Sequence, residues 1–349
     1  MRSSYREEDV IFLLKDITGM IDPLPTQERE RMIQSGKHYS EMLPLEYVPS
    51  ARYMEIYENA LQTYAKSVAA AVGILSDRIL ERRGEDVVLV SLARAGTPIG
   101  ILLRRYFRFK YDLDIPHYSI SIIRGRGIDE NAMRYLLERY EGRRLLFIDG
   151  WIGKGAILGE LRKDMECYEG VSPEIGVLAD PANETQLCGT HEDILIPSSC
   201  LNSTVSGLVS RTVLRDDLIG KDDFHGAVYY SELRNVDLSY QFIEAIEKEF
   251  VKENPAAAES PEGRGITEVE EIARHFGVED INKVKPGIGE TTRVLLRRVP
   301  WMVLIDERHR DNPELEPIVR LAKEKGTPVE YYPLQHYKCC GIIKKLADA

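Results

Sequence analysis

The sequence predicts an α/β protein with two domains, the first of which has a parallel sheet and a helical extension at its N-terminal end. From residue 87 to 197, unbroken apolar runs alternate with helical segments, as in parallel sheets that are covered on both faces. A stretch rich in proline, alanine, glycine and acids then separates this region from a second series of helices and strands. We therefore expect an α/β domain over 1–251, a linker over 252–264 and a small α/β domain over 265–349.

Composition indicates a soluble protein that is not a general nucleic-acid binder. The formal net charge is −11, and no apolar run approaches the roughly 20 residues of a membrane span. The N-terminal residues lack the small-residue cleavage site of a signal peptide. Five cysteines without a CxxC pair suggest reduced thiols, so we expect a cytoplasmic protein with no membrane contact and no zinc site. A homodimer is the one oligomeric state that we consider.

Helical periodicity dominates the first 85 residues. Apolar residues recur at helical spacing in 9–17 and in 47–84, and Gly84 ends the second of these segments. The pattern then changes to buried strands, and helical spacing returns at 239–253. The strands expected in the first domain are 87–93, 117–123, 143–149, 173–179 and 192–197.

The second domain repeats this mixture on a smaller scale. Its expected strands are 301–306 and 328–334. Its expected helices are 266–277, 290–298, 314–326 and a last one near 340–347.

The stretch RRLLFIDGWIGKGAILGEL, residues 143–161, predicts a binding site. A buried strand ends in Asp149, and a glycine-rich turn then opens a helix. The start of a helix offers unpaired N–H groups and the positive end of its dipole, which suit a phosphate. Gly153 and Gly155 let a phosphate approach the main chain, and Lys154 adds a charge. Asp149 is placed to accept hydrogen bonds from sugar hydroxyls.

Three phosphate-binding patterns compete for this stretch. A P-loop fails because Ile148 stands where a glycine is needed and Gly155 stands where a Ser or Thr is needed. The spacing of Gly150, Gly153 and Gly155 is wrong for a dinucleotide fingerprint. The third pattern, the motif of type I phosphoribosyltransferases for phosphoribosyl pyrophosphate (PRPP), resembles this stretch well. Residues 145–149 and the apolar pair 151–152 match it, whereas Gly150 replaces its second acid.

The other parts of the type I phosphoribosyltransferase layout occur in the expected order. The turn after the first strand, with Arg94, Ala95 and Gly96, corresponds to a pyrophosphate loop. After the second strand, Arg124 and Arg126 lie among glycines, as expected for a mobile basic lid that closes over the reaction.

The sequence also resembles the divergent phosphoribosyltransferases encoded in bacterial tellurite- and stress-resistance gene clusters, which are also labelled stress-induced cysteine proteases. The resemblance covers roughly residues 1–250. It implies a type I phosphoribosyltransferase core and a role in the stress response. In that role the enzyme would help to synthesise a nucleoside-like metabolite. The stretches that carry it are 33–46, 91–100, 117–129, 147–157 and 196–214.

The resemblance implies a PRPP-dependent glycosyltransferase that uses Mg²⁺. PRPP or another ligand containing ribose 5-phosphate would bind with its pyrophosphate on Ala95, Gly96 and Arg94, while Asp149 holds the ribose hydroxyls. Arg124 or Arg126 would close over the leaving group. The loop for the 5′-phosphate would be Gly153, Lys154, Gly155, Ala156 and Ile157. The candidates for binding the base-like acceptor are Ser203, Thr204, Ser206 and Arg211, with His38 and Tyr39 forming a hood.

The second domain resembles the Pelota-like RNA-binding domains. In PGIGETTRVLLRR, Gly287, Glu290 and Thr292 match the G-x-N-E-x-T-K loop of that family, and Arg293 stands for its lysine. Gly289 replaces the asparagine. The resemblance implies RNA as a partner of these residues.

Two other functions compete with a transferase. Gly150, in place of the second acid, favours a non-catalytic sensor of PRPP or a nucleotide that acts on RNA through the second domain. A cysteine protease would use Cys200 as its nucleophile, which needs a base such as His191 or His225 within reach.

Overall fold

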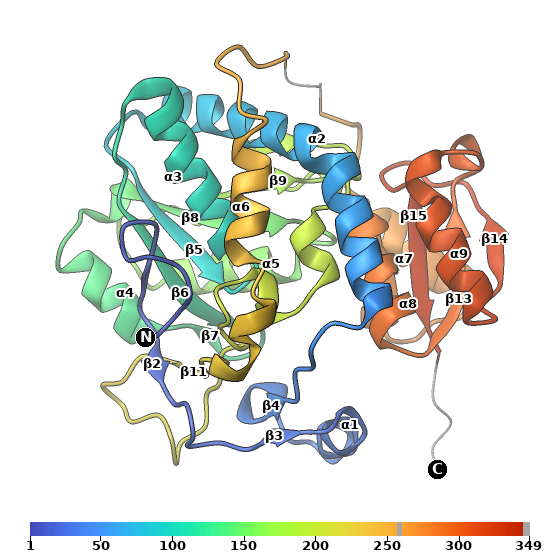
Figure 1. The fold of residues 1–349 in the computed structure, drawn as a ribbon, viewed down its shortest axis with the longest axis horizontal. Coiled ribbons are helices and arrows are strands. Elements are labelled where there is room, and N and C mark those ends of the chain that lie inside the picture. The colour runs from blue at the N-terminus through green and yellow to red at the C-terminus, as the bar shows by residue number, and fades with distance from the viewer. Residues whose placement is uncertain (257–259, 345–349) are drawn as a thin grey trace.

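A computed structural model, which describes residues 1–256 and 260–344, places a large sheet in the first expected domain and a smaller sheet in the second (Figure 1). The large sheet has the strand order β1-β6-β5-β8-β9-β10, and all these pairs are parallel. A short strand, β7, turns back antiparallel on β6. The strands are β1 (Ile11–Phe12), β5 (Val88–Ala93), β6 (His117–Ile123), β7 (Gly127–Ile128), β8 (Leu145–Trp151), β9 (Ile175–Ala179) and β10 (Cys188–Thr190).

Helices cover both faces of this sheet, which is why its central strands are buried along most of their length. On one face, Leu89 and Leu146 pack with α2, α3 and α6. On the other face, Val88 and Phe147 pack with α4 and α5. The helices are α2 (Ala51–Arg83), α3 (Thr97–Tyr111), α4 (Glu130–Leu137), α5 (Ala156–Met165) and α6 (Ser239–Glu247).

The helix predicted for residues 9–17 is wrong. These residues form β1 and a second short strand, β2 (Lys15–Asp16). β1 pairs with the outer edge of β6, where Ile11 lies opposite Tyr118. The open edge of a sheet offers unpaired backbone groups to an extended segment, and this pairing overrides the helical spacing of so short a run.

The fifth strand of the parallel sheet also differs from the prediction. The strand that pairs with β9 is β10, just before the predicted segment 192–197. Residues 192–196 lie outside the named strands, and Pro197 begins a 3-10 turn. Asp193 in this segment is buried, and it accepts hydrogen bonds from the second domain.

Shorter elements complete the first domain and its N-terminal extension. Two small two-stranded sheets lie beside the main sheet, and η1–η5 are 3-10 turns. The remaining elements are β3 (Pro23–Leu24), α1 (Thr26–Gln34), η1 (Tyr39–Glu41), β4 (Leu43–Pro44), η2 (Gly142–Arg144), η3 (Pro197–Cys200), η4 (Ser203–Val205), β11 (Gly226–Ala227) and η5 (Ser231–Val236).

The second domain contains a mixed sheet of order β12-β15-β13-β14. The helix predicted near 340–347 is wrong where the structure describes it, since residues 339–343 form β15, antiparallel to β12 and β13. Residues 345–347 lie outside the described chain. Periodicity cannot separate so short an apolar run from a buried helix. The elements are α7 (Gly265–His275), η6 (Ile281–Lys283), β12 (Val284–Pro286), α8 (Ile288–Arg297), β13 (Pro300–Ile305), η7 (Glu307–His309), η8 (Pro313–Leu315), α9 (Glu316–Glu324), β14 (Val329–Tyr331) and β15 (Cys339–Ile343).

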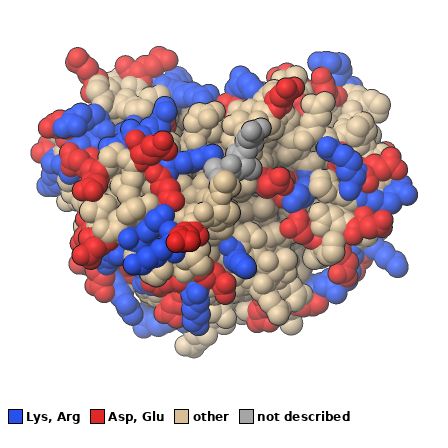
Figure 2. Space-filling view, turned by 90° about the horizontal axis from the view of Figure 1, so that it is seen from above, with Lys and Arg blue, Asp and Glu red and all other residues tan. Residues whose placement is uncertain are grey.

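The two regions are in direct contact. α2 crosses the first domain and begins beside α8, where the Tyr53 hydroxyl donates to the Leu296 carbonyl at 2.6 Å (Figure 1). On the face in Figure 2, acidic and basic side chains are interspersed. Within residues 1–256 and 260–344, no helix has both the length and the apolar character needed to cross a membrane.

Candidate functional site

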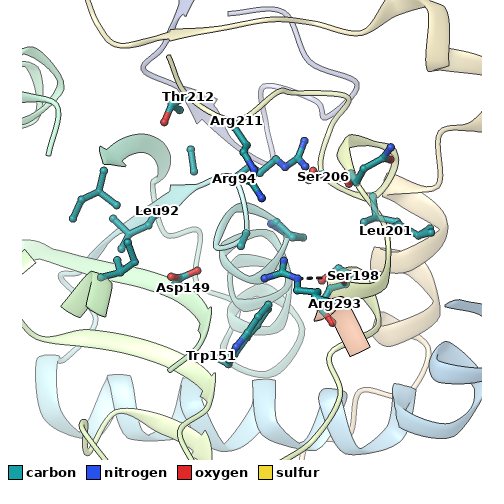
Figure 3. A pocket seen from close by; sticks show the side chains of 18 of the residues that line it. Leu92, Arg94, Asp149, Trp151, Ser198, Leu201, Ser206, Arg211, Thr212 and Arg293 are labelled. Carbon is teal, nitrogen blue, oxygen red and sulfur yellow. Dashed lines mark hydrogen bonds between the residues drawn. The ribbon is translucent and has the colours of Figure 1, made fainter. Parts of the chain in front are cut away.

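The sheet order creates a crevice at the carboxyl ends of β5 and β8. β5 lies between β6 and β8, so the chain leaves β5 toward one side of the sheet and returns on the other side. Ligands of open parallel sheets bind at such a switch point. A cavity of about 270 Å³ lies there, which we call the inner pocket (Figure 3). Its lining comprises Tyr39, Leu92, Ala93, Arg94, Ala95, Pro98, Ile122, Ile123, Asp149, Trp151, Ile157, Ser198, Ser199, Leu201, Asn202, Val205, Ser206, Arg211, Thr212 and Arg293.

Asp149 lies in the wall of the inner pocket, as the sequence predicts. Its carboxylate accepts a hydrogen bond from the Gly150 N–H at 2.8 Å. Burial raises the pKa of Asp149 to about 6, although the Gly150 N–H and the nearby Arg293 guanidinium both lower it. The carboxylate is therefore ionised at neutral pH and can accept hydrogen bonds from a ligand's hydroxyls.

The turn after β5 brings Arg94 and Ala95 into the same pocket. Gly96 is outside its lining and allows a close approach, since a Cβ there would lie 2.3 Å from the Ile148 carbonyl oxygen. The Arg94 guanidinium donates to the Val209 carbonyl at 3.0 Å and pairs with the Glu46 carboxylate at 2.7 Å.

Glu46 belongs to the candidate site through its contact with Arg94, and sequence reasoning missed it. Its side chain is buried, and it also accepts a hydrogen bond from the Ser203 N–H at 2.8 Å. Burial raises the pKa of Glu46, but Arg94 and Ser203 outweigh it and hold the pKa below its usual value. The carboxylate fixes Arg94 at the pocket wall. A lone acid in an irregular N-terminal segment carried no signal that could have revealed this pairing.

The glycine turn of residues 153–157 only partly faces the inner pocket. Ile157 lines the pocket, whereas Gly155 caps α5 with φ 82°. The Gly153 carbonyl accepts a hydrogen bond from the Tyr337 hydroxyl at 2.7 Å. Ala156 begins α5 with an exposed side chain.

The structure turns Lys154 away from the role predicted for it. Its ammonium group donates to the carbonyls of Ile281 and Val284 at 2.6 and 3.1 Å, and both belong to the second domain. Burial lowers the pKa of Lys154 to about 8. In this arrangement, Lys154 binds the second domain in place of a phosphate, because the predicted 5′-phosphate turn also forms the domain contact.

Arg124 and Arg126 do not belong to a long lid. They lie in the tight turn between β6 and β7, and neither lines the inner pocket. Arg126 pairs with Glu41 in the N-terminal extension. The Arg124 N–H donates to the Tyr39 hydroxyl at 2.9 Å, and its guanidinium donates to Asn282 in the second domain at 3.1 Å. The antiparallel pairing of β7 with β6 shortens the predicted loop to a turn.

The predicted acceptor residues divide into two groups. Ser206, Arg211 and Tyr39 line the inner pocket. Ser203 and Thr204 are buried in η4 outside its lining, and the Thr204 hydroxyl donates to Asn202 at 3.0 Å. The sequence could not separate these groups, because irregular 3-10 turns decide which hydroxyls face the cavity.

His38 was predicted for the acceptor site but lies outside the pocket lining, whereas three residues that were not predicted lie in it. The Nδ1 of His38 is 2.8 Å from the Ser40 hydroxyl, and the residue is not part of the pocket lining. Ser198, Ser199 and Asn202 line the pocket and were missed, although they lie in the hydroxyl-rich segment 196–214.

The predicted RNA-binding residues lie at the contact with the first domain. Gly287 caps α8 with φ 87° and packs against Asp193, while the buried Thr292 hydroxyl donates to the Ile288 carbonyl at 2.8 Å. Glu290 and Arg293 form an ion pair at 3.1 Å. Gly287 and Thr292 are both buried in this arrangement, and RNA contact through them stays a prediction.

Arg293 instead completes the inner pocket from the second domain. Its guanidinium carbon lies 4.8 Å from the centre of the Trp151 ring, and its Nε donates to the Ser199 carbonyl at 3.3 Å. Figure 3 shows Arg94, Arg211 and Arg293 around a common space that Asp149 and Trp151 border. Three guanidinium groups and one carboxylate suit a ligand that carries both phosphates and hydroxyls.

The histidines considered as bases for Cys200 have other partners. His191 lies against Cys188, with 3.4 Å between its Nε2 and the sulfur. Burial raises the pKa of the Cys188 thiol to about 11, which disfavours the thiolate needed for attack. The Nδ1 of His225 is 2.8 Å from the Ser121 hydroxyl.

The residues present fit a magnesium ion that arrives on a ligand. Within the part of the chain that the structure describes, no group of three or more His, Cys, Asp or Glu could hold a metal ion by itself. Asp149 is the only carboxylate in the described lining of the inner pocket. Mg²⁺ in phosphate sites is typically held by one or two carboxylates together with phosphates and water, so Asp149 is a sufficient protein contribution.

The fold and the inner pocket define an α/β protein with a ligand crevice at the switch point of its parallel sheet. The chain belongs to the StiP family: residues 3–247 match the model described as "Tellurite-like stress resistance cysteine protease StiP". Residues 263–345 match the model of the PELOTA RNA binding domain. These matches confirm the predicted family and the presence of a Pelota-type domain at the C-terminal end.

A curated relative and two solved structures are similar to this chain. "Cysteine protease StiP" of Acinetobacter baylyi (strain ATCC 33305 / BD413 / ADP1) is 36% identical over 367 residues, covering 98% of this chain and 94% of the relative. A hypoxanthine-guanine phosphoribosyltransferase of Bacillus anthracis str. 'Ames Ancestor' is 18% identical, with a TM-score of 0.25, covering 37% of this chain and 71% of that one. A second structure of that enzyme, with a HEPES molecule in the active site, is 15% identical, with a TM-score of 0.24. The match covers 41% of this chain and 75% of that one.

Proposed function

We propose that this protein is a phosphoribosyltransferase, which transfers the phosphoribosyl group of PRPP to a base-like acceptor or catalyses the reverse reaction. The observation that carries the proposal is the placement of Asp149 and Arg94 in one pocket, at the ends of β8 and β5. A carboxylate and a guanidinium at this position suit the ribose hydroxyls and the pyrophosphate of a single ligand. The metabolic role would be synthesis of a nucleoside-like compound in a stress response.

The proposed reaction exchanges one bond at C1 of the ribose. A nitrogen of the acceptor bonds to C1 while the bond from C1 to the pyrophosphate oxygen breaks, and the electron pair leaves with pyrophosphate. The acceptor nitrogen then loses its proton to solvent. Asp149 orients the ribose, and Arg94 neutralises charge that develops on the leaving group. A magnesium ion bound to the pyrophosphate would supply further charge neutralisation.

Calorimetry with PRPP and Mg²⁺ tests this proposal directly. We expect saturable binding to the wild-type protein, and pyrophosphate release when a cell extract supplies the acceptor. Asp149→Asn should reduce turnover at least about 100-fold, because the ribose loses a charged acceptor group in the transition state. Asp216→Asn, at an exposed position outside the inner pocket, is the matched control and should behave like the wild type.

The same measurements separate the proposal from its rivals. A non-catalytic sensor, which Gly150 favours, would bind PRPP without releasing pyrophosphate under any acceptor supply. A cysteine protease, which the relative's name suggests, would lose its activity in Cys200→Ala or Cys188→Ala and keep it in Asp149→Asn. If PRPP, ribose 5-phosphate and nucleoside monophosphates all fail to bind in the presence of Mg²⁺, the transferase proposal is wrong.

A further inference from the structure

The glycine turn that was predicted to hold a 5′-phosphate lies against an acidic side chain of the second domain. Glu290 lies in the first turn of α8, and its Cγ is 3.9 Å from the position that a Cβ on Gly153 would take. Glu290 also lines a cavity of about 650 Å³ beside the inner pocket, and Arg293 lines both cavities. Anions typically bind at a glycine turn before a helix, and here the protein places a carboxylate of its own beside such a turn.

Two cations of the second domain converge on this carboxylate. The Glu290 carboxylate lies 3.1 Å from the Arg293 guanidinium and 3.8 Å from the Lys285 ammonium. In the part of the chain that the structure describes, no other carboxylate lies within salt-bridge distance of either cation. The Lys154 ammonium of the first domain also acts on Glu290, while its own hydrogen bonds go to two neutral carbonyl groups. Glu290 therefore occupies the centre of a group of cations.

The charges at this contact are not balanced. Burial raises the pKa of Glu290, but Arg293, Lys285 and Lys154 outweigh burial and hold the pKa below its usual value. Burial lowers the pKa of Lys285, and although Glu290 raises it, neighbouring guanidinium groups such as that of Arg293 keep it below its usual value. A second acid, Asp280, also acts on Lys154, but its carboxylate caps η6. Arg293 and Lys285 thus share one carboxylate, and the contact favours a ligand with more negative charge.

A phosphate monoester suits this group of cations better than a carboxylate does. It carries a charge of about −1.5 to −2 at neutral pH and three acceptor oxygens, so it can contact several cations at once. A guanidinium group can bind two phosphate oxygens in parallel, and an ammonium group adds a point charge. Arg293 also borders the inner pocket, in which Asp149 is placed to hold the ribose hydroxyls (Figure 3). Both ends of a sugar phosphate therefore have a partner around one space.

We propose that Arg293 and Lys285 form a phosphate subsite beside the glycine turn, which Glu290 occupies as an internal substitute until the phosphate group of a ligand displaces it. The cavity that Glu290 lines gives its side chain room to turn away. The internal carboxylate lowers the affinity for phosphate, because the cations must first release it. The second domain thus replaces the charge of Lys154, which it withdraws from the turn. The subsite deepens the proposed function, and the assignment of its ligand as the 5′-phosphate of PRPP rests on that function.

Calorimetry of the full-length protein with ribose 5-phosphate and with inorganic phosphate tests the subsite. Glu290→Gln should tighten the binding of both about tenfold, because a neutral amide no longer competes for the cations. Its amide oxygen can still contact Arg293, which also stays on the Ser199 carbonyl. Glu307→Gln changes an exposed pair with the same spacing, Glu307 and Arg310, outside both cavities, and it should bind both ligands like the wild type. Unchanged or weaker phosphate binding by Glu290→Gln would overturn the proposal, since a residue that merely orients Arg293 gives that result.

Lys285→Gln tests the subsite independently of the domain contact that Glu290 makes. It should weaken the binding of both ligands roughly tenfold, whereas Lys325→Gln, at an exposed position of the same domain, should leave it unchanged. Equal affinities of these two variants would overturn the proposal. Ribose 5-phosphate should bind more tightly than inorganic phosphate, and equal affinities would assign the subsite to free phosphate and contradict its link with the transferase. Tighter phosphate binding by Glu290→Gln without PRPP uptake contradicts only the transferase, whereas PRPP uptake that Glu290→Gln leaves unchanged contradicts only this inference.

Discussion

At the scale of single residues, Asp149 combines its proposed role in ligand binding with a cost to stability. Burial raises its folded-state pKa from 3.8 to about 6. The folded protein therefore binds this proton more tightly than the unfolded chain does. As the pH rises from about 4 to 6, ionisation of Asp149 lowers the free energy of unfolding. Above pH 6 this loss of stability stays constant. Carboxylates that serve a ligand are commonly held at such a cost.

Asp149→Asn should therefore stabilise the protein while it lowers the turnover of the proposed reaction. We expect the free energy of unfolding at pH 7.5 to rise on the order of 1–3 kcal/mol, because the variant has no charge to bury. At pH 3.5 the gain should nearly vanish, since the wild-type carboxyl is then mostly protonated in both states. Urea denaturation at the two pH values measures this difference. An equal effect of the substitution at both values would contradict the assigned cause.

Arg293 should be required for ligand binding although it belongs to the second domain. Arg293→Ala should weaken PRPP binding roughly 10- to 100-fold, since charge-assisted hydrogen bonds are worth about 1.5–3 kcal/mol. Arg293→Lys should restore little, because a lysine cannot both cover Trp151 and bond Ser199. Calorimetry measures the affinities. Arg310→Ala removes a similar guanidinium from the Tyr331 ring far from the pocket lining, and it should bind PRPP normally.

At the scale of elements, the packing of the segment after α6 against the long helix α2 depends on the lack of a side chain at Gly73. A Cβ at Gly73 would lie 2.2 Å from the Oδ1 of Asn254, and the Asn254 amide donates to Asp77 at 3.0 Å and to the Tyr106 hydroxyl at 2.8 Å. The glycine therefore lets the segment after α6 pack across α2. Local helix propensity alone would favour alanine at this position.

Gly73→Ala should destabilise the protein by about 1–3 kcal/mol, because overpacking outweighs the roughly 1 kcal/mol that alanine contributes to a helix. Gly159→Ala in α5 is the matched control, since its Cβ would meet no atom within 4 Å. This second variant should be stabilised by about 0.5–1 kcal/mol. Thermal unfolding followed by circular dichroism compares the two. A stabilised Gly73→Ala variant would show that Asn254 moves at no cost.

The elements that the sequence predicted correctly are those with strong local patterns. The apolar runs of β5, β6, β8 and β9 and the long periodicity of α2 lie where expected. The errors fall on short apolar runs. Those at 9–17 and near 340 become β1 and β15 through pairing with a neighbouring strand, and the strand predicted at 192–197 is replaced by β10 just before it. Pairing partners far along the chain decide such segments, and local spacing contains no information about them.

At the scale of the whole molecule, the docking of the two domains decides which predicted residues form the candidate site. Asp149 and Arg94 could be predicted because strand ends of one sheet converge. The turn of Lys154 toward Ile281 and the entry of Arg293 into the inner pocket could not be predicted, because both depend on a contact between separate domains. The residues assigned to RNA and to the 5′-phosphate thus meet in one interface.

Asp193 is one of the residues that join the two domains at this interface. Its buried carboxylate accepts hydrogen bonds from the N–H groups of Ile288, the first residue of α8, and Lys338, both at 2.9 Å. Burial raises the pKa of Asp193 to about 6, although these two N–H groups lower it. An acid from the first domain thus caps the helix that carries Glu290 and Arg293, where the helix dipole also favours a negative charge.

Asp193→Ala should loosen the second domain and thereby damage the inner pocket from a distance. The N–H groups of Ile288 and Lys338 would lose their acceptor, at a cost of about 1–3 kcal/mol for the buried N–H of Ile288. We expect the amides of Ile288 and Lys338 to exchange hydrogen faster, and PRPP binding to weaken as much as in Arg293→Ala, because Arg293 leaves Trp151. Asp193→Asn retains one carbonyl acceptor and should show smaller changes in both measurements. If exchange accelerates while PRPP affinity stays unchanged, Arg293 does not act on the ligand and the inner pocket belongs to the first domain alone.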